Sequence, residues 1–471
     1  MVNNRIGKWS RLLGTVVITA TVTVLGLKWV GADFSPLAGE ASYQKFLSAY
    51  ELLSENYFQQ VPPQKLLEGA IGGMVQSVGD PFSLYMNPGM TARFRELVTS
   101  HFQGIGAVLS LQLQSGNMVI TTVMPGSPAQ KAGLAPGDVL LKIAGVSTSG
   151  MSLEQAVEKI RGPQGTYVTL DIRRGDQEHT VKVMRARLAQ ATVYARMLPD
   201  QIGYLLITQF SEDTATTFVR DLDILKKSGA RALIIDVRDD PGGLLQSVAR
   251  ISDALLPKSK KIVQIQDRNG KREVLRSTGG GVQMPMVCLI NGNSASAAEI
   301  LAGALKESAN VPLIGERTYG KGTVQETRGF TDGSSIKLTV ARWLTPDGQW
   351  IHKRGIAPTI AVPTPSYYRL SALSMNLSTP YGLNANNVQI AVLQRMLLAL
   401  GFNPGRTDGY FSQETKDAVS VFQRQNHIPV TGELNNATAY ALNVAMLRLK
   451  QREDPQLTAA IGYLEQKLIR Q

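Results

Sequence analysis

The sequence has very few of the residues that most often carry metal or redox chemistry. Cys288 is the one cysteine among 471 residues, so a single chain forms neither an internal disulfide nor a cysteine-based metal site. Four histidines occur, and none lies at a spacing typical of metal ligands: His101, His179, His352 and His427. The sequence therefore implies no metal and no organic cofactor, and it does not indicate a histidine-dependent mechanism.

Dense runs of lysine and arginine are also missing, although the chain has a formal net charge of +12. A basic excess favours anionic partners, and nucleic acid, acidic lipid and anionic wall polymers all qualify. Without a concentrated basic segment, nucleic acid is not predicted as a partner. The hydrophobic fraction of 43% and the charged fraction of 18% are typical of folded domains, and the length predicts roughly three or four of them.

Long apolar runs are absent apart from residues 12–27, which three basic residues precede and Lys28 and Trp29 follow. As a helix this run is about 24 Å long, slightly short of a ~30 Å hydrocarbon core, but flanking Lys and Trp side chains can reach the interface. Residues 1–34 are therefore predicted to be a membrane anchor, with a cleaved signal peptide as the alternative. Either one places the rest of the chain outside the cytoplasm.

Three regions with different periodicity follow this segment. Apolar residues at helical spacing predict a helical region, with helices that pack on each other, over residues 40–100. Residues 101–186 alternate like strands and contain Gly and Pro turns, which predicts a compact β-rich module. Between 187 and 362 strand-like runs alternate with helical stretches, which predicts an α/β core. The expected fold is a multidomain chain that combines α/β and β domains with helical regions.

The C-terminal part of the chain is predicted to be helical. Residues 363–386 contain proline and serine without clear periodicity, so they are expected to form a linker. Residues 387–445 contain two amphipathic helical stretches separated by a Gly/Asp turn, which predicts a small all-helical domain. Residues 446–471 are expected to form a helical tail.

The β-rich module begins with FQGIGAVL (102–109), where glycines precede a strand. Successive N–H groups of Gly104, Ile105 and Gly106 can converge on an anion such as a peptide carboxylate, while the rest of that peptide adds to the sheet edge. The order of turns, short helix and strand over residues 123–165 resembles a PDZ domain of a bacterial protease. That resemblance implies that Gly104, Ile105 and Gly106 recognise C-terminal tails. Arg161, at the end of the second helix, could report ligand occupancy, and a module without a ligand is the alternative.

The stretch NGNSASAAEILAGALKES (291–308) contains two serines just before a helix. Either serine could simply cap the helix, but a strand-to-helix turn also exposes a nucleophilic Oγ near the positive end of the helix. Lys321 follows Ser296 by 25 residues, within TYGKGTVQ. A lysine acts as a base when burial lowers its pKa, and Gln325 could orient its amine. Each motif alone is more often structural than catalytic.

The motif ALIIDVRDDPGG (232–243) precedes the serine motif and the lysine motif in the chain. In this order and spacing the three motifs resemble the carboxyl-terminal processing proteases, also called tail-specific proteases, and the resemblance extends from about residue 41 to 362. It implies that Ser296 is the nucleophile, Lys321 the general base and Gln325 its supporting residue.

The glycines of ALIIDVRDDPGG follow an apolar strand, so their N–H groups can point at a tetrahedral oxyanion. The predicted oxyanion hole therefore comprises Gly242 or Gly243 together with the amide of Ala297. The chain departs from the family pattern at Ala298 and Thr359, and neither departure is expected to touch a reacting atom.

Residues 388–442 resemble the small helical peptidoglycan-binding domain that is attached to many cell-wall enzymes. Most of the matching residues are core and turn residues, so they indicate the fold better than a binding surface. The resemblance implies peptidoglycan as a partner, and a structural lid or spacer is the alternative.

Together these patterns predict a serine endopeptidase at the bacterial cell membrane, with its catalytic part on the wall side. The expected partners are the C-terminal tails of proteins, peptidoglycan and the membrane, and the helical arm is compatible with a homodimer. Two alternatives stay open. One is a non-catalytic scaffold built from the PDZ and wall-binding domains, and the other is a cell-wall hydrolase with an appended PDZ domain.

Overall fold

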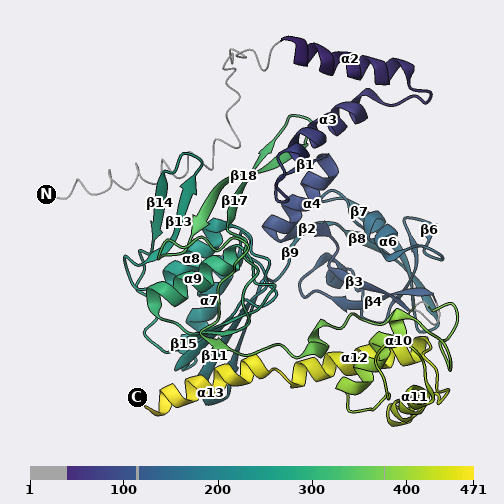
Figure 1. Cartoon of the computed structure of the whole chain (residues 1–471). Helices are drawn as coiled ribbons and strands as arrows, with labels where there is room; N and C mark the ends of the chain where they lie inside the picture. The colour runs from purple at the N-terminus through teal and green to yellow at the C-terminus, as the bar shows by residue number, and fades with distance from the viewer. Residues whose placement is uncertain (1–39, 113–115, 376, 471) are drawn as a thin grey trace. The chain divides into compact units, whose positions relative to one another are not determined.

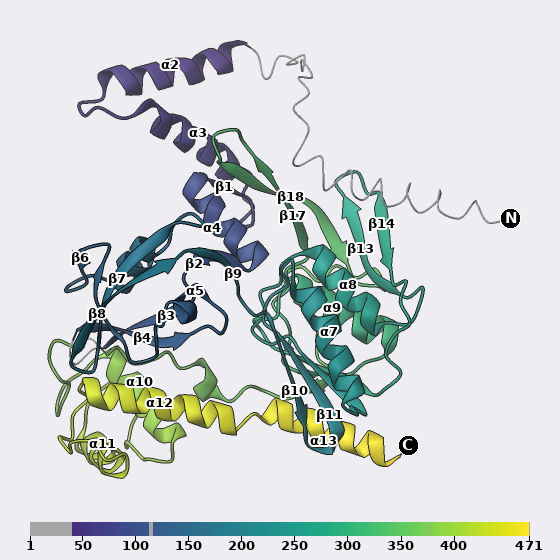
Figure 2. The same ribbon diagram turned by 180° about the vertical axis from the view of Figure 1, so that it is seen from behind.

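The computed structural model describes residues 40–112, 116–375 and 377–470 (Figure 1, Figure 2). The predicted membrane segment, residues 1–34, lies outside these residues. Within them, no helix combines the length and the apolar character that crossing a membrane requires. The chain forms two units, of which the first contains the residues up to Arg95 together with Asp267–Gly270 and Thr323–Arg342, and the second contains the remainder.

The first unit contains the predicted helical region. Its elements are α2 (Glu40–Asn56), α3 (Pro63–Ser77), β1 (Leu84–Met86), most of α4 (Pro88–Thr99), β17 (Thr323–Gly329) and most of β18 (Ser335–Leu344). Strands β1 and β17 both pair antiparallel with β18. The side chains of Tyr43, Phe46 and Leu53 on α2 are exposed, so the apolar face that was expected to pack within the chain is open here.

The second unit begins with the β-rich module that the alternating pattern predicts. Its elements are β2 (His101–Gly104), β3 (Ala107–Gln112), β4 (Asn117–Val123), α5 (Pro128–Lys131), β5 (Val139–Ile143), β6 (Val146–Ser147), α6 (Leu153–Ile160), β7 (Tyr167–Arg174), β8 (Gln177–Met184) and β9 (Ala186–Ala189). In β7 alternate side chains point inward, so Val168, Leu170 and Ile172 join the core. Helix α6 starts at a capping box formed by Ser152 and Gln155, which satisfies its first free N–H groups.

The α/β core is a six-stranded sheet with helices packed on it. In spatial order the strands are β10 (Val193–Leu198), β11 (Ile202–Ile207), β12 (Ala232–Asp236), β15 (Met286–Ile290), β16 (Leu313–Gly315) and β19 (Ile360–Ala361). Strands β10 and β11 are antiparallel, and the other neighbours are parallel. The remaining elements are η1 (Pro199–Gln201), α7 (Thr214–Lys227), α8 (Leu245–Leu255), the hairpin of β13 (Lys261–Asp267) and β14 (Arg272–Arg276), and α9 (Ala297–Ala309).

Both faces of this sheet are covered, which explains why its strands are apolar at nearly every position. Helix α7 packs against β10 and β11, and α9 packs against β15. The other face meets α13 (Pro455–Ile469), as Figure 1 shows. Its Ala460 and Leu464 are buried together with Ile234 and Leu289 of the sheet. The last helix of the chain is therefore part of the hydrophobic core of this domain.

The small helical domain has a separate core. It contains η2 (Ser366–Arg369), α10 (Val388–Ala399), α11 (Gln413–Gln425) and α12 (Asn436–Arg452). Leu373, in the segment that was expected to be a linker, is buried in this core, and Tyr367 packs against it. Helix α12 continues past residue 445, the expected end of the domain, to Arg452.

Candidate active site

Three loops leave the carboxyl ends of neighbouring parallel strands, and these loops contain the candidate catalytic residues. Strand β12 leads into residues 237–244, β15 into residues 291–296, and β16 into residues 316–322. Since neighbouring parallel strands end at one edge of the sheet, the loops come together there, where open α/β sheets place their binding sites.

Ser296 occupies a strained turn at the start of α9. Its backbone has φ 55° and ψ −112°, a positive-φ combination outside the allowed regions that costs energy for any residue with a side chain. A nucleophilic serine in a sharp strand-to-helix turn has this kind of strain, because that backbone conformation exposes its Oγ. Ser294 differs, since it is buried and its Oγ donates to the carbonyl oxygen of Val237 at 2.8 Å. The structure thus separates the two serines into one structural residue and one candidate nucleophile.

The two candidate oxyanion glycines also differ. A Cβ at Gly242 would lie 2.8 Å from the Cβ of Ser296 and 2.9 Å from the nitrogen of Ala297, so the loop passes directly beside the candidate nucleophile. However, the N–H of Gly242 already donates to Asp240 Oδ1 at 2.7 Å. Within the described part of the chain, the N–H groups of Gly243 and Ala297 donate no hydrogen bond. The geometry therefore favours Gly243 over Gly242 as the partner of Ala297.

The turn that carries Lys321 is held by its backbone. The N–H of Lys321 donates to Glu299 Oε2 at 2.8 Å, and its carbonyl oxygen accepts from Trp343 Nε1 at 2.8 Å. The preceding residue, Gly320, has φ 90°, and a Cβ there would lie 2.8 Å from the nitrogen of Gly355. Glycine is therefore required before the lysine for steric reasons, which explains one half of the Gly-Lys-Gly pattern.

Glu299, which the motif analysis did not single out, joins the serine turn to the lysine turn. Its Oε2 accepts from the N–H of Ser296 at 2.9 Å and from that of Lys321 at 2.8 Å, so these two nitrogens lie within about 6 Å of each other. Its Oε1 accepts from Gly320 N–H and from Thr318 Oγ1. Burial raises the pKa of this carboxyl, and the four hydrogen bonds oppose that effect. The capping-box spacing of Ser296 and Glu299 was the available sequence signal.

Gln325 lies on β17, in the other unit of the chain. Its Nε2 donates to Thr323 Oγ1 at 2.8 Å and to Thr339 Oγ1 at 3.2 Å. The proposed contact between Gln325 and the amine of Lys321 stays a prediction.

Asp240 is a fully buried carboxyl in the loop that carries the oxyanion glycines. Its Oδ1 accepts from Gly242, while Oδ2 has no hydrogen-bond partner among the described residues. Burial raises the pKa of Asp240 to about 8, and the hydrogen bond from Gly242 offsets this only in part. The side chain is therefore neutral over much of the physiological range.

This raised pKa predicts a pH-dependent stability. Because the folded chain binds the Asp240 proton more tightly than the unfolded chain, the free energy of unfolding falls as pH rises from near 4 to about 8. Asp240→Asn keeps the shape of the side chain but does not titrate. We therefore expect the free energy of unfolding of this variant, relative to that of wild type, to increase with pH by up to about 1.4 kcal/mol per pH unit in that range. Urea unfolding of both proteins at pH 5.5 and pH 7.5 measures this difference, and a constant difference would contradict the raised pKa.

The predicted peptide-binding residues lie where β2 leaves its pairing with β9. The side chain of Ile105 is buried in the core of the β-rich module, so only its backbone is available to a ligand. Gly106 has φ 85°, and a Cβ there would lie 2.3 Å from Ser127 Cβ. Arg161 Nη1 donates to Glu96 Oε2 at 2.8 Å, and its guanidinium lies 6.0 Å from the centre of the Phe102 ring. Arg161 thus links the end of α6 to the segment that enters the module.

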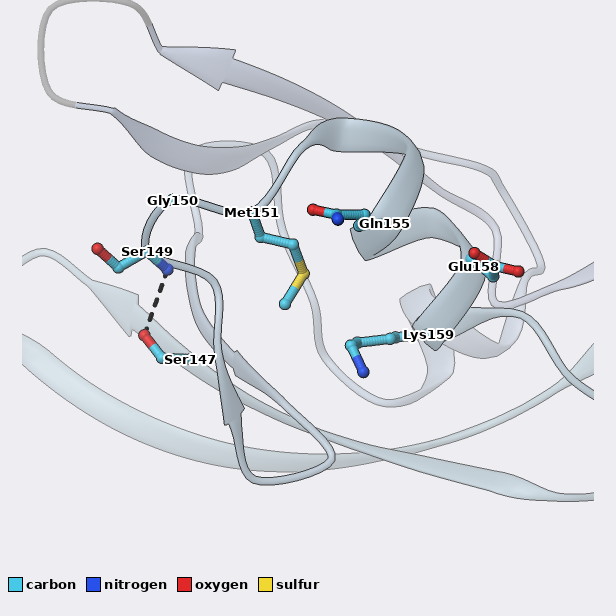
Figure 3. A pocket seen from close by; sticks show the side chains of 7 residues that line it. All are labelled: Ser147, Ser149, Gly150, Met151, Gln155, Glu158 and Lys159. Carbon is cyan, nitrogen blue, oxygen red and sulfur yellow. Dashed lines mark hydrogen bonds between the residues drawn. The ribbon is translucent and has the colours of Figure 1, made fainter. Parts of the chain in front are cut away.

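A shallow hollow lies elsewhere on this module, between the turn after β6 and helix α6 (Figure 3). The side chains of Met151 and Lys159 point into it, and Ser147 Oγ accepts from Ser149 N–H at 3.2 Å beside it. None of the predicted peptide-binding residues lines this hollow.

Cys288 and all four histidines lie among the described residues. No group of three or more His, Cys, Asp or Glu side chains among them is placed to hold a metal ion. Cys288 is fully buried in β15, and burial raises the pKa of its thiol, so the thiol stays protonated.

The two departures from the family pattern are structural. Ala298 is buried in α9, and Thr359 Oγ1 accepts from the N–H of Leu313.

Comparison with known proteins identifies the domains. Residues 201–362 match the model of peptidase family S41, residues 119–174 a PDZ domain, residues 386–442 a peptidoglycan binding domain, and residues 31–89 the N-terminal domain of the activating protease CtpB. The carboxy-terminal processing protease CtpA of Bacillus subtilis (strain 168) is 38% identical over 456 residues, which cover 96% of each chain. The chain belongs to the carboxy-terminal processing proteases of family S41.

Carboxy-terminal processing protease CtpB of the same organism is 39% identical over 469 residues, or 97% of each chain. Among solved structures, the photosystem II D1 C-terminal processing protease is 28% identical, with a TM-score of 0.40, and covers 68% of this chain and 92% of its own. The family matches and the two Bacillus relatives confirm the predictions of a serine-type carboxy-terminal processing peptidase, of its PDZ domain and of a domain of the peptidoglycan binding family. The S41 match contains all the candidate catalytic and oxyanion residues, whereas the PDZ match contains Arg161 but not Gly104, Ile105 or Gly106.

Proposed function

We propose that this processing protease cleaves peptide bonds by Ser-Lys catalysis. Neutral Lys321 takes the proton of the Ser296 hydroxyl as its Oγ attacks the scissile carbonyl, and the N–H groups of Gly243 and Ala297 stabilise the oxyanion. The leaving amine takes that proton as the peptide bond breaks, and water then hydrolyses the acyl-serine. The observation that carries this proposal is the strained turn at Ser296, joined to the Lys321 turn through the carboxylate of Glu299.

Cleavage of an unstructured protein tests this proposal. The full chain should degrade such a protein, and Ser296→Ala should lose that activity by at least about 10³-fold, because no other nucleophile replaces Oγ. Ser252→Ala is the matched control, since this buried serine of α8 has no hydrogen-bond partner for its Oγ within the described residues. Wild type that cleaves no faster than Ser296→Ala would contradict the proposal and favour a non-catalytic scaffold.

The proposed substrate is a protein whose free C-terminal tail enters the PDZ domain. The backbone N–H groups of Gly104, Ile105 and Gly106 bind the terminal carboxylate, and Arg161 reports occupancy through its ion pair with Glu96. A hydrophobic peptide with a free C-terminus should stimulate cleavage of an unstructured protein, and the same peptide with an amidated C-terminus should not. Equal stimulation by both peptides would exclude carboxylate recognition.

The proposed location is the outer side of the cell membrane, with residues 1–34 as the anchor and peptidoglycan as the partner of the C-terminal domain. A hollow between the end of α10 and α11 supports a wall-binding surface, because it is lined by Leu400, Phe402, Asp417 and Val421 among others. Val421→Asp should reduce co-sedimentation of the protease with purified peptidoglycan, whereas Val388→Asp, which is outside the hollow, should not. Equal retention of both variants would favour a structural spacer.

The exposed apolar face of α2 supports a homodimer as part of this proposal. Sedimentation velocity of the full chain should then give twice its 51.1 kDa mass. A monomer at micromolar concentration would contradict the dimer.

A further inference from the structure

The helix that follows the wall-binding domain belongs to the protease core. The chain leaves the core after β19 and returns to it at Asp454, which caps α13 by accepting from the N–H of Leu457. Helix α13 then lies against β12, β15 and β16 (Figure 1, Figure 2). The wall-binding domain is thus an insertion whose two ends both attach to the catalytic domain.

Gln456 joins these two ends directly. Its Nε2 donates to the carbonyl oxygen of Val362 at 2.9 Å and to Thr364 Oγ1 at 3.2 Å, both where the chain leaves the core. Its Oε1 accepts from Arg238 Nη1 at 3.2 Å, at the root of the loop after β12. Because Gln456 is itself buried, these contacts are shielded from water.

Arg238 is held between two carboxylates at this junction. Its Nη1 and Nη2 donate to the two oxygens of Asp454 at 2.8 Å and 2.7 Å, a bidentate pair. Its Nη2 also donates to Asp236 Oδ2 at 2.6 Å, and that oxygen accepts from the hydroxyl of Tyr204. The Arg238 side chain is 14% exposed and that of Asp454 is 22% exposed, so solvent screens this pair less than a surface ion pair.

The loop that Arg238 begins is the one that carries the proposed oxyanion donors. Asp239, in a left-handed conformation, accepts through Oδ1 from Asn291 and Asn293, which lie just before the candidate nucleophile. The carbonyl oxygen of Asp240 accepts from the N–H of Ala295 at 2.9 Å. A continuous set of contacts therefore runs from α13 through Arg238 to the turns of the proposed oxyanion hole and nucleophile.

We infer that Asp454 is a positioning residue for the oxyanion loop, acting through Arg238, and that α13 therefore takes part in catalysis by this protease. The inference rests on the active site proposed above. Without the carboxylate of Asp454, the guanidinium loses one of its two anionic partners, and only Asp236 and Gln456 still hold the root of the loop, so the loop is held less tightly. A displacement near 1 Å at a reacting group typically costs about 10²-fold in rate.

The test compares Asp454→Asn with Glu453→Gln in the full chain. Glu453 is the matched control, because it is the adjacent acid and its Oε1 pairs with Arg452. For a peptide substrate, Asp454→Asn should lower kcat by about 10- to 100-fold and leave KM within about twofold. Glu453→Gln should match wild type, and Asp454→Glu should recover part of the lost kcat. Arg238→Gln should lower kcat at least as far as Asp454→Asn does, because it also leaves the buried carboxylate of Asp236 without its cation.

Thermal unfolding separates positioning from simple stabilisation. All rates are measured well below the lowest Tm of the set, so that each variant is folded. A wild-type kcat in Asp454→Asn would overturn the inference even if its Tm falls, and so would an equal loss in Glu453→Gln. If wild type itself cleaves no faster than Ser296→Ala, the proposed function fails, and this inference fails with it.

Discussion

Replacing Lys321 with arginine is expected to lower kcat/KM by about 10³-fold or more. Arginine has a side chain of similar length, but its guanidinium does not lose its proton in proteins, so it cannot accept the proton of Ser296. The turn itself should persist, because Glu299 and Trp343 hold Lys321 through its backbone N–H and carbonyl groups. The variant should therefore combine a near-normal Tm with almost no turnover.

Lys353→Arg is the matched control for this substitution. Lys353 is exposed and its N–H donates to the carbonyl oxygen of Gly320 in the same region, so the exchange should leave kcat/KM within about twofold. Single-turnover measurements would place the defect in acylation, because Lys321 acts when Ser296 attacks. More than a tenth of wild-type activity in Lys321→Arg would show that another group serves as the base.

Replacing Glu299 with glutamine is expected to impair both turnover and stability. All four groups around the carboxylate donate hydrogen bonds, two to each oxygen. Glutamine offers one accepting oxygen and one donating NH₂, so one pair of donors loses its acceptor in a buried site. Each buried donor left unpaired costs about 1–3 kcal/mol. The turns of Ser296 and Lys321 would also lose their common anchor, which should lower kcat by about 10- to 100-fold.

Glu307→Gln on the same helix is the control for this effect. Glu307 is partly buried and accepts from the N–H of Asp347, away from both turns, so its replacement should leave kcat unchanged. Thermal unfolding and kcat are measured for both variants. If Glu299→Gln lowers Tm but retains full kcat, the carboxylate stabilises the fold without setting the geometry of the two turns.

The parts of the site that the sequence predicted are those with a local physical signal. A strand-to-helix turn with Gly, Asn and Ser residues, glycines after an apolar strand and a lysine between glycines each leave a short pattern. Their common order over residues 232–325 resembles one protease family, which the 38% identity to a relative then confirmed. The PDZ domain and the domain of the peptidoglycan binding family were predictable for the same reason.

Other parts were not predictable, because they depend on residues far apart in the chain. Asp454 meets Arg238 across 216 positions, and no periodicity near either residue indicates this pair. Residues 446–471 read as a plain helical tail, although α13 buries Ala460 and Leu464 against the sheet. The linker expected at 363–386 gave no helical pattern, yet Leu373 lies in a hydrophobic core. In each of these cases the structural role of the residue depends on a contact with another segment of the chain.

By itself, the sequence determined the class of enzyme, and it predicted which serine and lysine carry the proposed chemistry. Turn residues and the alternation of apolar residues are local properties, so the amino-acid sequence shows them directly. Only the tertiary structure decided which glycine N–H has no acceptor among the described residues, which carboxylate joins the turns of Ser296 and Lys321, and where α13 lies. These outcomes depend on the order of β12, β15 and β16 in the sheet, which brings three distant loops to one edge.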